Sequence, residues 1–187
     1  MIEQHHYTKG CSLTCVYMHG LFESATGKLC GVAMWLPPTR VACESVNKDE
    51  WRRVLSLTRL VILPGVPKNA CSFLLSRSVK MIQSEGRFVS LVTYADEGEG
   101  HTGAIYKAAN WTFVGTSKPT PKWIDSEGRQ RARKSTKNRT DAEMIALGCR
   151  LVGSFSKHKY VLHLWQRRKP MFDTLNLLTK FVWASAL

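Results

Sequence analysis

Two residues near the middle of the chain, Asp96 and Tyr106, carry side chains suited to acid–base chemistry. Asp96 follows an apolar run at 88–94 that predicts a strand, and Tyr106 lies in a short predicted helix at about 102–109. Side chains that follow a strand can converge on a cleft, where a carboxylate and a phenol could move protons or hold the edge of a base. The alternative is an acidic, solvated loop with Tyr106 packed in the core, and the pattern leaves both interpretations open.

A second candidate site is the connection at 64–69 between an apolar run and a predicted helix at 70–85. A loop that enters a helix offers unpaired N–H groups and the positive end of the helix dipole, which suits a pyrophosphate. Gly65 and Asn69 favour a tight backbone there, and Ser72 offers a hydroxyl in the first turn. The alternative is an ordinary strand–helix connection.

A run of cations at 129–139 is the third feature. It contains Arg129, Arg131, Arg133, Lys134, Lys137 and Arg139 with no acid among them, and Trp123 upstream offers a ring for stacking. The whole chain has 27 Lys and Arg against 14 Asp and Glu, a net charge of +13. Such a balance indicates a nucleic-acid partner and predicts that these side chains bind DNA phosphates and little else. The alternatives are a solvated loop, or an anionic membrane surface, for which no basic amphipathic helix stands out.

The elements that must position these residues alternate irregularly between strands and helices. Strands are predicted at 13–22, 29–36, 58–63, 88–94, 111–116 and 159–165, and helices at 47–57, 70–85, 102–109 and 141–147. The first two strands form a hairpin with Gly27 in its turn. This order favours a mixed α+β fold, a central mixed sheet flanked by helices, over strict βαβ alternation. We expect one catalytic domain at 1–170 with a basic insertion at about 117–140, and a helical tail at 171–187.

Features of targeting and redox chemistry are sparse. The N-terminus lacks the basic and apolar regions of a signal peptide, and no run approaches the roughly 18 apolar residues that span a bilayer. The six cysteines are scattered, which indicates reduced thiols and a cytoplasmic protein. Cys11 and Cys15 beside His6 lack the second ligand pair that a zinc site needs.

Several of these residues together resemble a known family. They are His6-Tyr7, Arg59-Leu60, Pro67-x-Asn69-x-x-Ser72, Asp96 and Gly103-x-Ile105-Tyr106-x-Ala108-x-Asn110-Trp111. This combination resembles the Mom proteins of Mu-like phages over roughly 5–165, most closely from Arg59 to Trp111. Mom proteins are in turn similar to the GNAT acyltransferases, so the resemblance implies a GNAT-like acyltransferase fold. The sequence PGVPKN at 64–69 departs from the GNAT pattern Arg/Gln-x-x-Gly-x-Gly.

The resemblance implies a DNA-modifying transferase that acts on phage DNA in the host cytoplasm. It would convert adenine to a carbamoylmethyl derivative, and this modification would protect the phage DNA from host restriction. The product has the adenine nitrogen bonded to a CH2 group, which attack on a thioester carbonyl does not give. Attack at a different carbon of acetyl-CoA or a related acyl donor, a metal-assisted radical route, and a glycine-derived donor, for which tRNA is a carrier, each fit the atoms.

Roles for individual residues follow from the resemblance. Asp96 would accept a proton from the amine or orient it. Arg59 and Ser72, with Asn69 and Gly65, would position the donor. His6, Tyr7 and Tyr106 would line the base pocket, and His6 with Tyr7 would hold iron if the radical route applies.

Two other functions remain open at this point. A GNAT-type enzyme that acylates a small molecule or a protein would not need DNA. A non-enzymatic DNA-binding accessory protein would not need the carboxylate and phenol at 96 and 106.

Overall fold

A computed structural model describes residues 2–5, 14–133, 138–165 and 178–183 of the chain. The main sheet consists of β1 (Tyr17–Glu23), β2 (Leu29–Leu36), β3 (Val54–Ile62), β4 (Ser90–Asp96), β5 (Thr112–Thr116), β9 (Lys157–His163) and β10 (Leu178–Trp183). The smaller sheet consists of β6 (Thr120–Ile124), β7 (Gln130–Arg131) and β8 (Arg150–Phe155). The α-helices are α1 (Ile2–His5), α2 (Arg40–Glu44), α3 (Ala70–Glu85), α4 (Ala104–Ala108) and α5 (Asp141–Ala146), and two 3-10 turns are η1 (Trp51–Arg53) and η2 (Glu97–Glu99).

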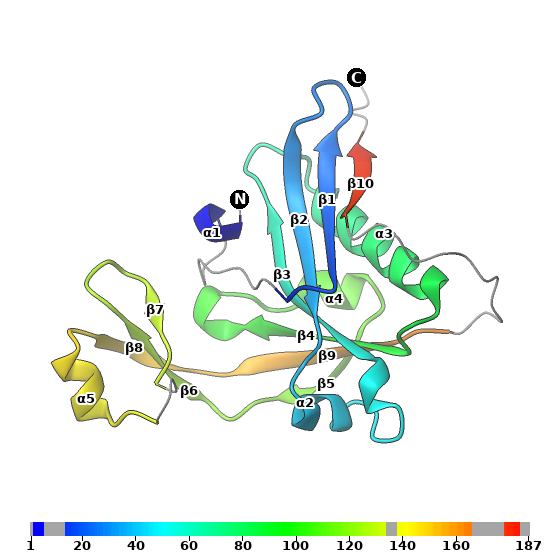
Figure 1. Ribbon diagram of the computed structural model, residues 1–187. Helices are drawn as coiled ribbons and strands as arrows, with labels where there is room; N and C mark the ends of the chain where they lie inside the picture. The colour runs from blue at the N-terminus through cyan, green and yellow to red at the C-terminus, as the bar shows by residue number, and fades with distance from the viewer. Residues whose placement is uncertain (1, 6–13, 134–137, 166–177, 184–187) are drawn as a thin grey trace.

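The main sheet is mixed, with the strand order β10-β1-β2-β3-β4-β9-β5. The pairs β1–β10 and β3–β4 are parallel, and the others are antiparallel. The three-stranded sheet β7-β6-β8 extends with α5 to one side of the main sheet (Figure 1). We call this extension, from Thr120 to Phe155, the arm. The expected mixed α+β fold, a central mixed sheet flanked by helices, is confirmed.

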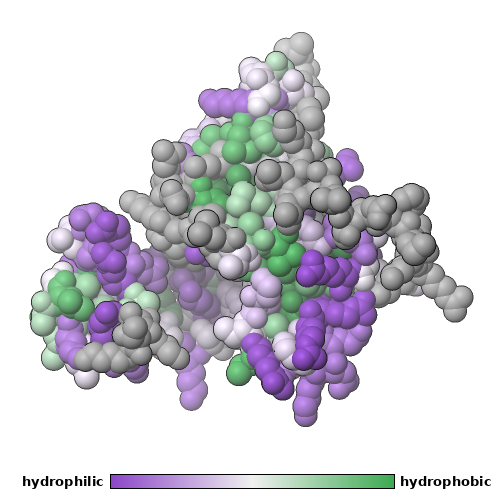
Figure 2. All heavy atoms as spheres, in the orientation of Figure 1, coloured by the Kyte–Doolittle hydropathy of each residue, from purple (hydrophilic) through white to green (hydrophobic). Residues whose placement is uncertain are grey.

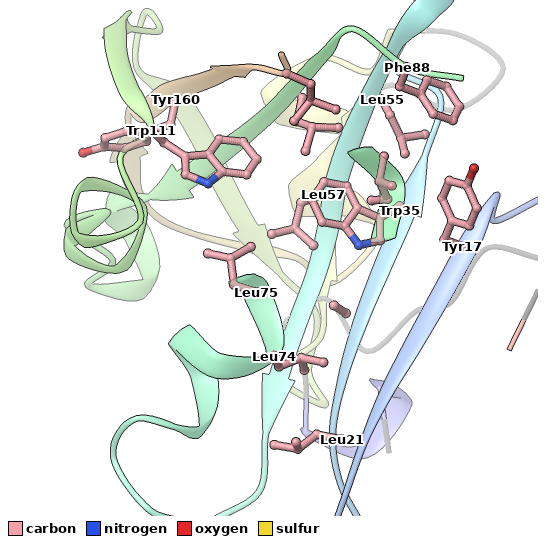
Figure 3. Close-up of a cluster of buried hydrophobic side chains, with 14 of the residues drawn as sticks. Tyr17, Leu21, Trp35, Leu55, Leu57, Leu74, Leu75, Phe88, Trp111 and Tyr160 are labelled. Carbon is pink, nitrogen blue, oxygen red and sulfur yellow. The ribbon is translucent and has the colours of Figure 1, made fainter. Parts of the chain in front are cut away.

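The longest helix, α3, covers one face of the main sheet. Its buried residues, which include Leu74, Leu75 and Ile82, pack on β1, β2 and β3 in the main hydrophobic core (Figure 3). The predicted bounds of this helix are correct, and Gly86, at φ 66°, ends it in the left-handed conformation. We call the sheet face under α3 the helix face and the other the open face.

A polar network lies inside this core. The indole N–H of Trp35 donates to Ser78 Oγ over 2.7 Å, and His19 Nδ1 shares a short hydrogen bond with the same oxygen. His19 is only 2% exposed, and burial lowers its pKa to about 4. The imidazole is therefore neutral in the folded protein at neutral pH.

Two predictions of secondary structure are wrong. In place of the helix expected at 47–57, the amide of Glu50 donates to the side chain of Asn47, and η1 and the start of β3 follow. Residues from Val54 to Leu57 are buried on both faces of a central strand, so they lack the alternation that marks a strand. The tail, expected to be helical, supplies β10 alongside β1. No helix of the described residues is long and apolar enough to cross a membrane.

Candidate active site at the fork between β3 and β4

The parallel strands β3 and β4 pair over only part of their length. The ladder runs from Val54 opposite Ser90 to Leu57 opposite Thr93 and then stops, although both strands continue. Backbone groups beyond this point have no partner across the gap. We call the place where the two strands separate the fork, because such unpaired peptide edges can receive an extended ligand.

A β-bulge sits on β3 at the fork. Trp35 of β2 lies opposite Leu57, but the next β2 residue, Met34, lies opposite Arg59, so Thr58 is the extra residue. The hydroxyl of Thr58 donates to the carbonyl of Met34 over 3.2 Å. The bulge turns Arg59 to the open face, beside Met34, while Leu57 remains on the helix face.

Tyr106 approaches the fork from the helix face. It shares a side-chain hydrogen bond with Thr93, whose hydroxyl donates to the carbonyl of Leu57 over 3.2 Å. Its ring packs on Trp111 and Tyr160, with centroids 5.8 and 5.4 Å away. Burial raises the pKa of Tyr106, and the side-chain hydrogen bond with Thr93 only partly offsets this effect. The phenol is therefore protonated at neutral pH.

The first turn of α3 leaves donors for a ligand on the same face. Ala70 N donates to the carbonyl of Pro67, and Phe73 N and Ser72 Oγ both donate to the carbonyl of Asn69. Among the described residues no acceptor is present for the amides of Cys71 and Ser72. This is the anion-binding end expected of the helix dipole.

A groove of about 760 Å³ runs from this turn along α3 to the end of α4, and Asn69, Ser72 and Trp111 line it. Trp111 is 4% exposed, and its indole nitrogen has no hydrogen-bond partner among the described residues. Figure 3 shows this nitrogen on the side of the ring that faces Leu75 of α3. Gly65 lines a different hollow, of about 320 Å³, beside β1 and β2.

Asp96 lies on the open face, opposite Tyr106. It is 6% exposed, its Oδ1 accepts from the amide of Gly98 over 3.0 Å, and its Oδ2 lies 3.0 Å from Nζ of Lys157. Side chains alternate along a strand, so Asp96 and Thr93 point to opposite faces. The carboxylate and the phenol named from the sequence thus flank the same fork without sharing a cleft. Asp96 instead lines a small cavity of about 50 Å³ between β4 and the arm.

The arm presents the basic segment, and hydrophilic residues cover much of its surface (Figure 2). Arg129 and Arg131 are exposed, but both make ion pairs with Asp125, at 3.0 and 2.9 Å. Burial alone would raise the pKa of Asp125, but hydrogen bonds from the two arginines outweigh it and lower the pKa to about 2. The expectation that these cations contact little besides DNA is therefore wrong for Arg129 and Arg131, while their contact with DNA phosphates stays a prediction.

Arg133 also has partners within the arm. Arg133 pairs with Asp141 at 3.1 Å and donates through Nε to the carbonyl of Arg139. Lys134 and Lys137 lie outside the described residues. Each exposed pair contributes little to stability in water, so a phosphate can replace the acid as partner.

Trp123 does not supply the surface ring expected from the sequence. It is 2% exposed and packs with Met144 and Cys149 in the core of the arm, because the small sheet and α5 need an apolar layer between them. The arm is fixed to the main sheet by Lys122, which pairs with Glu99 and donates to the carbonyl of Gly98 over 2.9 Å.

The predicted metal ligands His6 and Tyr7 lie outside the described residues. Within the described part of the chain, no three His, Cys, Asp or Glu side chains converge as a metal site would need.

The sequence did not indicate Thr93, Lys157 or Tyr94, which the structure places beside the predicted residues. Only strand register brings Lys157 to Asp96 and Thr93 to the fork. Local motifs do not reveal this register, so they could not have identified these residues.

Solved structures that are similar to this chain include acetyltransferases. An N-acetyltransferase from Staphylococcus aureus is 15% identical, with a TM-score of 0.45 over 75% of this chain and 64% of that one. The ribosomal-protein-S18-alanine N-acetyltransferase from Escherichia coli is 9% identical, also with a TM-score of 0.45, over 79% of this chain and 70% of that one.

Comparison of sequences identifies a closer relation. The protein named methylcarbamoylase mom, from Escherichia phage Mu, is 26% identical over 186 residues, which cover 93% of this chain and 74% of that protein. The model of the Mom protein family matches residues 1–179, and the chain therefore belongs to the Mom protein family.

Proposed function

We propose that this protein is a DNA-modifying transferase that adds a carbamoylmethyl group to the exocyclic amine of adenine in phage DNA and so protects that DNA from host restriction. The observation that carries the proposal is the match to the phage Mu methylcarbamoylase along almost the whole chain. The basic arm beside the buried Asp96 carboxylate supports it, since it offers cations for phosphates next to a hydrogen-bond acceptor.

Asp96 is assigned to the adenine amine. This amine is a weak nucleophile because its lone pair is delocalised into the purine, so it needs an acceptor for its proton. Each carboxylate oxygen of Asp96 uses one of its acceptor positions, for Gly98 and for Lys157, and retains another. The target base must leave the helical stack to reach this position, at a cost of a few kcal/mol.

The donor is assigned to the helix face. The free amides of Cys71 and Ser72 suit a phosphate, and the groove with Trp111 suits an elongated acyl carrier such as an acyl-CoA. Tyr106, protonated at the fork, would then donate a hydrogen bond to the bound donor. A glycine-derived donor on tRNA would enter from the same face. Arg59, on the open face, is assigned to the base side, not to the donor.

Iron has no step in this proposal. The residues proposed to hold it, His6 and Tyr7, lie outside the described part of the chain, and no described cluster of His, Cys, Asp or Glu completes a ligand set.

Mass analysis of nucleosides tests the proposed function. DNA from cells that express this chain should contain a deoxyadenosine heavier by one C2H3NO unit, and DNA from cells that express the Asp96→Asn variant should not. Unmodified adenine with the parent chain would refute the proposal. Turnover of a small amine by the same preparation, independent of DNA, would then support a GNAT-type acyltransferase.

A further inference from the structure

Tyr94 is the one exposed residue of β4. The other residues of this strand are buried, whereas Tyr94 is 38% exposed. An aromatic side chain that is open to solvent in a central strand means that the sheet is uncovered there, between α2 and the arm. The ring lies on the open face, two residues before Asp96.

Charged residues share the open face of the sheet with Tyr94. Tyr94 is the register partner of Lys159, and Asp96 is that of Lys157, so the four side chains occupy adjoining positions on the open face. Tyr94 is also the first β4 residue beyond the fork, and Arg59 projects to the same face from β3. The open face at the fork thus presents one aromatic residue together with three cations and one carboxylate.

This set of groups matches the chemistry of a nucleotide. A purine stacks on an aromatic ring, its exocyclic amine donates to a carboxylate, and its phosphates bind cations. Burial, and to a smaller extent the nearby Cys43, raises the pKa of Tyr94, so the ring carries no charge that would repel a phosphate.

We propose that Tyr94 is the platform on which the extruded adenine stacks, with its amine directed toward Asp96 and its phosphate toward Lys159. The inference rests on the proposed function and assigns the base pocket to the open face of the fork. Lys159 now donates to the side chain and carbonyl of Ser45, at 2.8 and 3.3 Å, and these are contacts that a phosphate can replace.

The test compares two single-stranded probes of equal length and charge, an oligodeoxyadenylate and an abasic oligonucleotide. Stacking on one aromatic side chain contributes about 1–3 kcal/mol per base, so Tyr94→Leu should weaken binding of the oligodeoxyadenylate about 5- to 150-fold. The affinity of the Tyr94→Leu variant for the abasic probe should equal that of the parent. Tyr94→Phe keeps the ring and should bind as the parent does.

Two further variants serve as controls. Phe113 is 48% exposed on β5 and packs against Tyr160, on the helix face of the same sheet, so Phe113→Leu should leave both affinities unchanged. Lys159→Gln should weaken binding of both probes equally. It should also reduce the slope of log affinity against log salt by about 0.7. Thermal unfolding of each variant checks that the fold is kept.

The outcomes separate this inference from the proposed function. An equal loss for both probes in Tyr94→Leu, or no loss for either, would overturn the platform. So would parental levels of modified adenine in DNA from cells that express Tyr94→Leu. Selective loss of oligodeoxyadenylate binding with no modified adenine from the parent would keep the platform and refute the proposed function.

Discussion

Nζ of Lys157 lies 3.0 Å from Oδ2 of Asp96, across the antiparallel pair of β4 and β9, where the two residues are register partners. The carboxylate is 6% exposed, so its negative charge depends on this ammonium and on the Gly98 amide for stabilisation. The pair positions a charged acceptor at the boundary between the main sheet and the arm.

Replacement of Asp96 should separate catalysis from binding. Asp96→Asn keeps the shape and can still accept from Gly98, but it removes the charge and the basicity. We expect a folded protein that binds duplex DNA at least as well as the parent, because one repelling charge is lost. Modified adenine should fall about 10²- to 10⁴-fold, the usual cost of losing a positioned acid–base group.

The neighbouring carboxylate provides a matched control. Glu97 pairs with His158 at 3.0 Å and is more exposed, so Glu97→Gln should retain most activity. Modification by Asp96→Asn within a few-fold of the parent would remove Asp96 from the catalytic assignment.

Asp125 should restrain DNA binding by the arm. Asp125→Asn removes the ion pair of Arg131 and one of the two ion pairs of Arg129, whose other partner is Glu127, so duplex DNA should bind more tightly. The plot of log affinity against log salt should steepen by about 0.9 for each arginine that gains a phosphate.

The triple variant Arg131→Ala, Arg133→Ala, Lys134→Ala should weaken binding to every sequence alike. Unchanged salt slopes in both variants would show that the arm is only a solvated surface.

Ligands of the helix-face groove should stabilise the fold. If the groove binds an acyl-CoA, millimolar acetyl-CoA should raise the Tm, since a ligand that binds only the folded state stabilises it. Ser72→Ala should reduce this shift, because it removes a hydroxyl that lines the groove. Differential scanning fluorimetry measures the shift. No shift in the parent would count against a CoA donor and favour a glycine-derived one.

His19 should make stability depend on pH. Its pKa is lowered to about 4 in the folded protein, whereas the unfolded value is about 6.5. Between these values the unfolded state binds the extra proton, so stability is complete above pH 6.5 and falls as the pH drops toward 4. From pH 6.5 to 5 this group alone should cost about 2 kcal/mol. Urea unfolding at both pH values should show a smaller difference in His19→Leu; an equal difference would mean that other groups cause it.

Gly103 should tolerate no side chain. It has φ 73°, and an added Cβ would lie 2.3 to 2.5 Å from ring atoms of Tyr160, which packs on Tyr106. Gly103→Ala should therefore cost more than the about 1–2 kcal/mol of a left-handed backbone alone. Gly27→Ala is the control, since Gly27 has φ 67° with open space around it. Equal losses in free energy of unfolding would show that the Tyr160 contact does not matter.

The sequence by itself determined the local features of this protein. The period of apolar residues and Gly86 set the bounds of α3, and turn residues such as Gly27 marked the first hairpin. The basic run and the net charge of +13 indicated a polyanionic partner, and the motif from Gly103 to Trp111 indicated the family. These features depend on neighbours in the chain, so a single sequence contains them.

Tertiary structure alone decided how these features combine. The bulge at Thr58 turns Arg59 to the open face, and strand alternation puts Asp96 and Tyr106 on opposite sides of the fork. Register brings Lys157 beside Asp96 and puts Tyr94 on the same face. In the arm, packing buries Trp123, and Asp125 forms ion pairs with two arginines. Pairings between distant segments set these relationships, because one residue of slip in a strand moves every side chain to the other face.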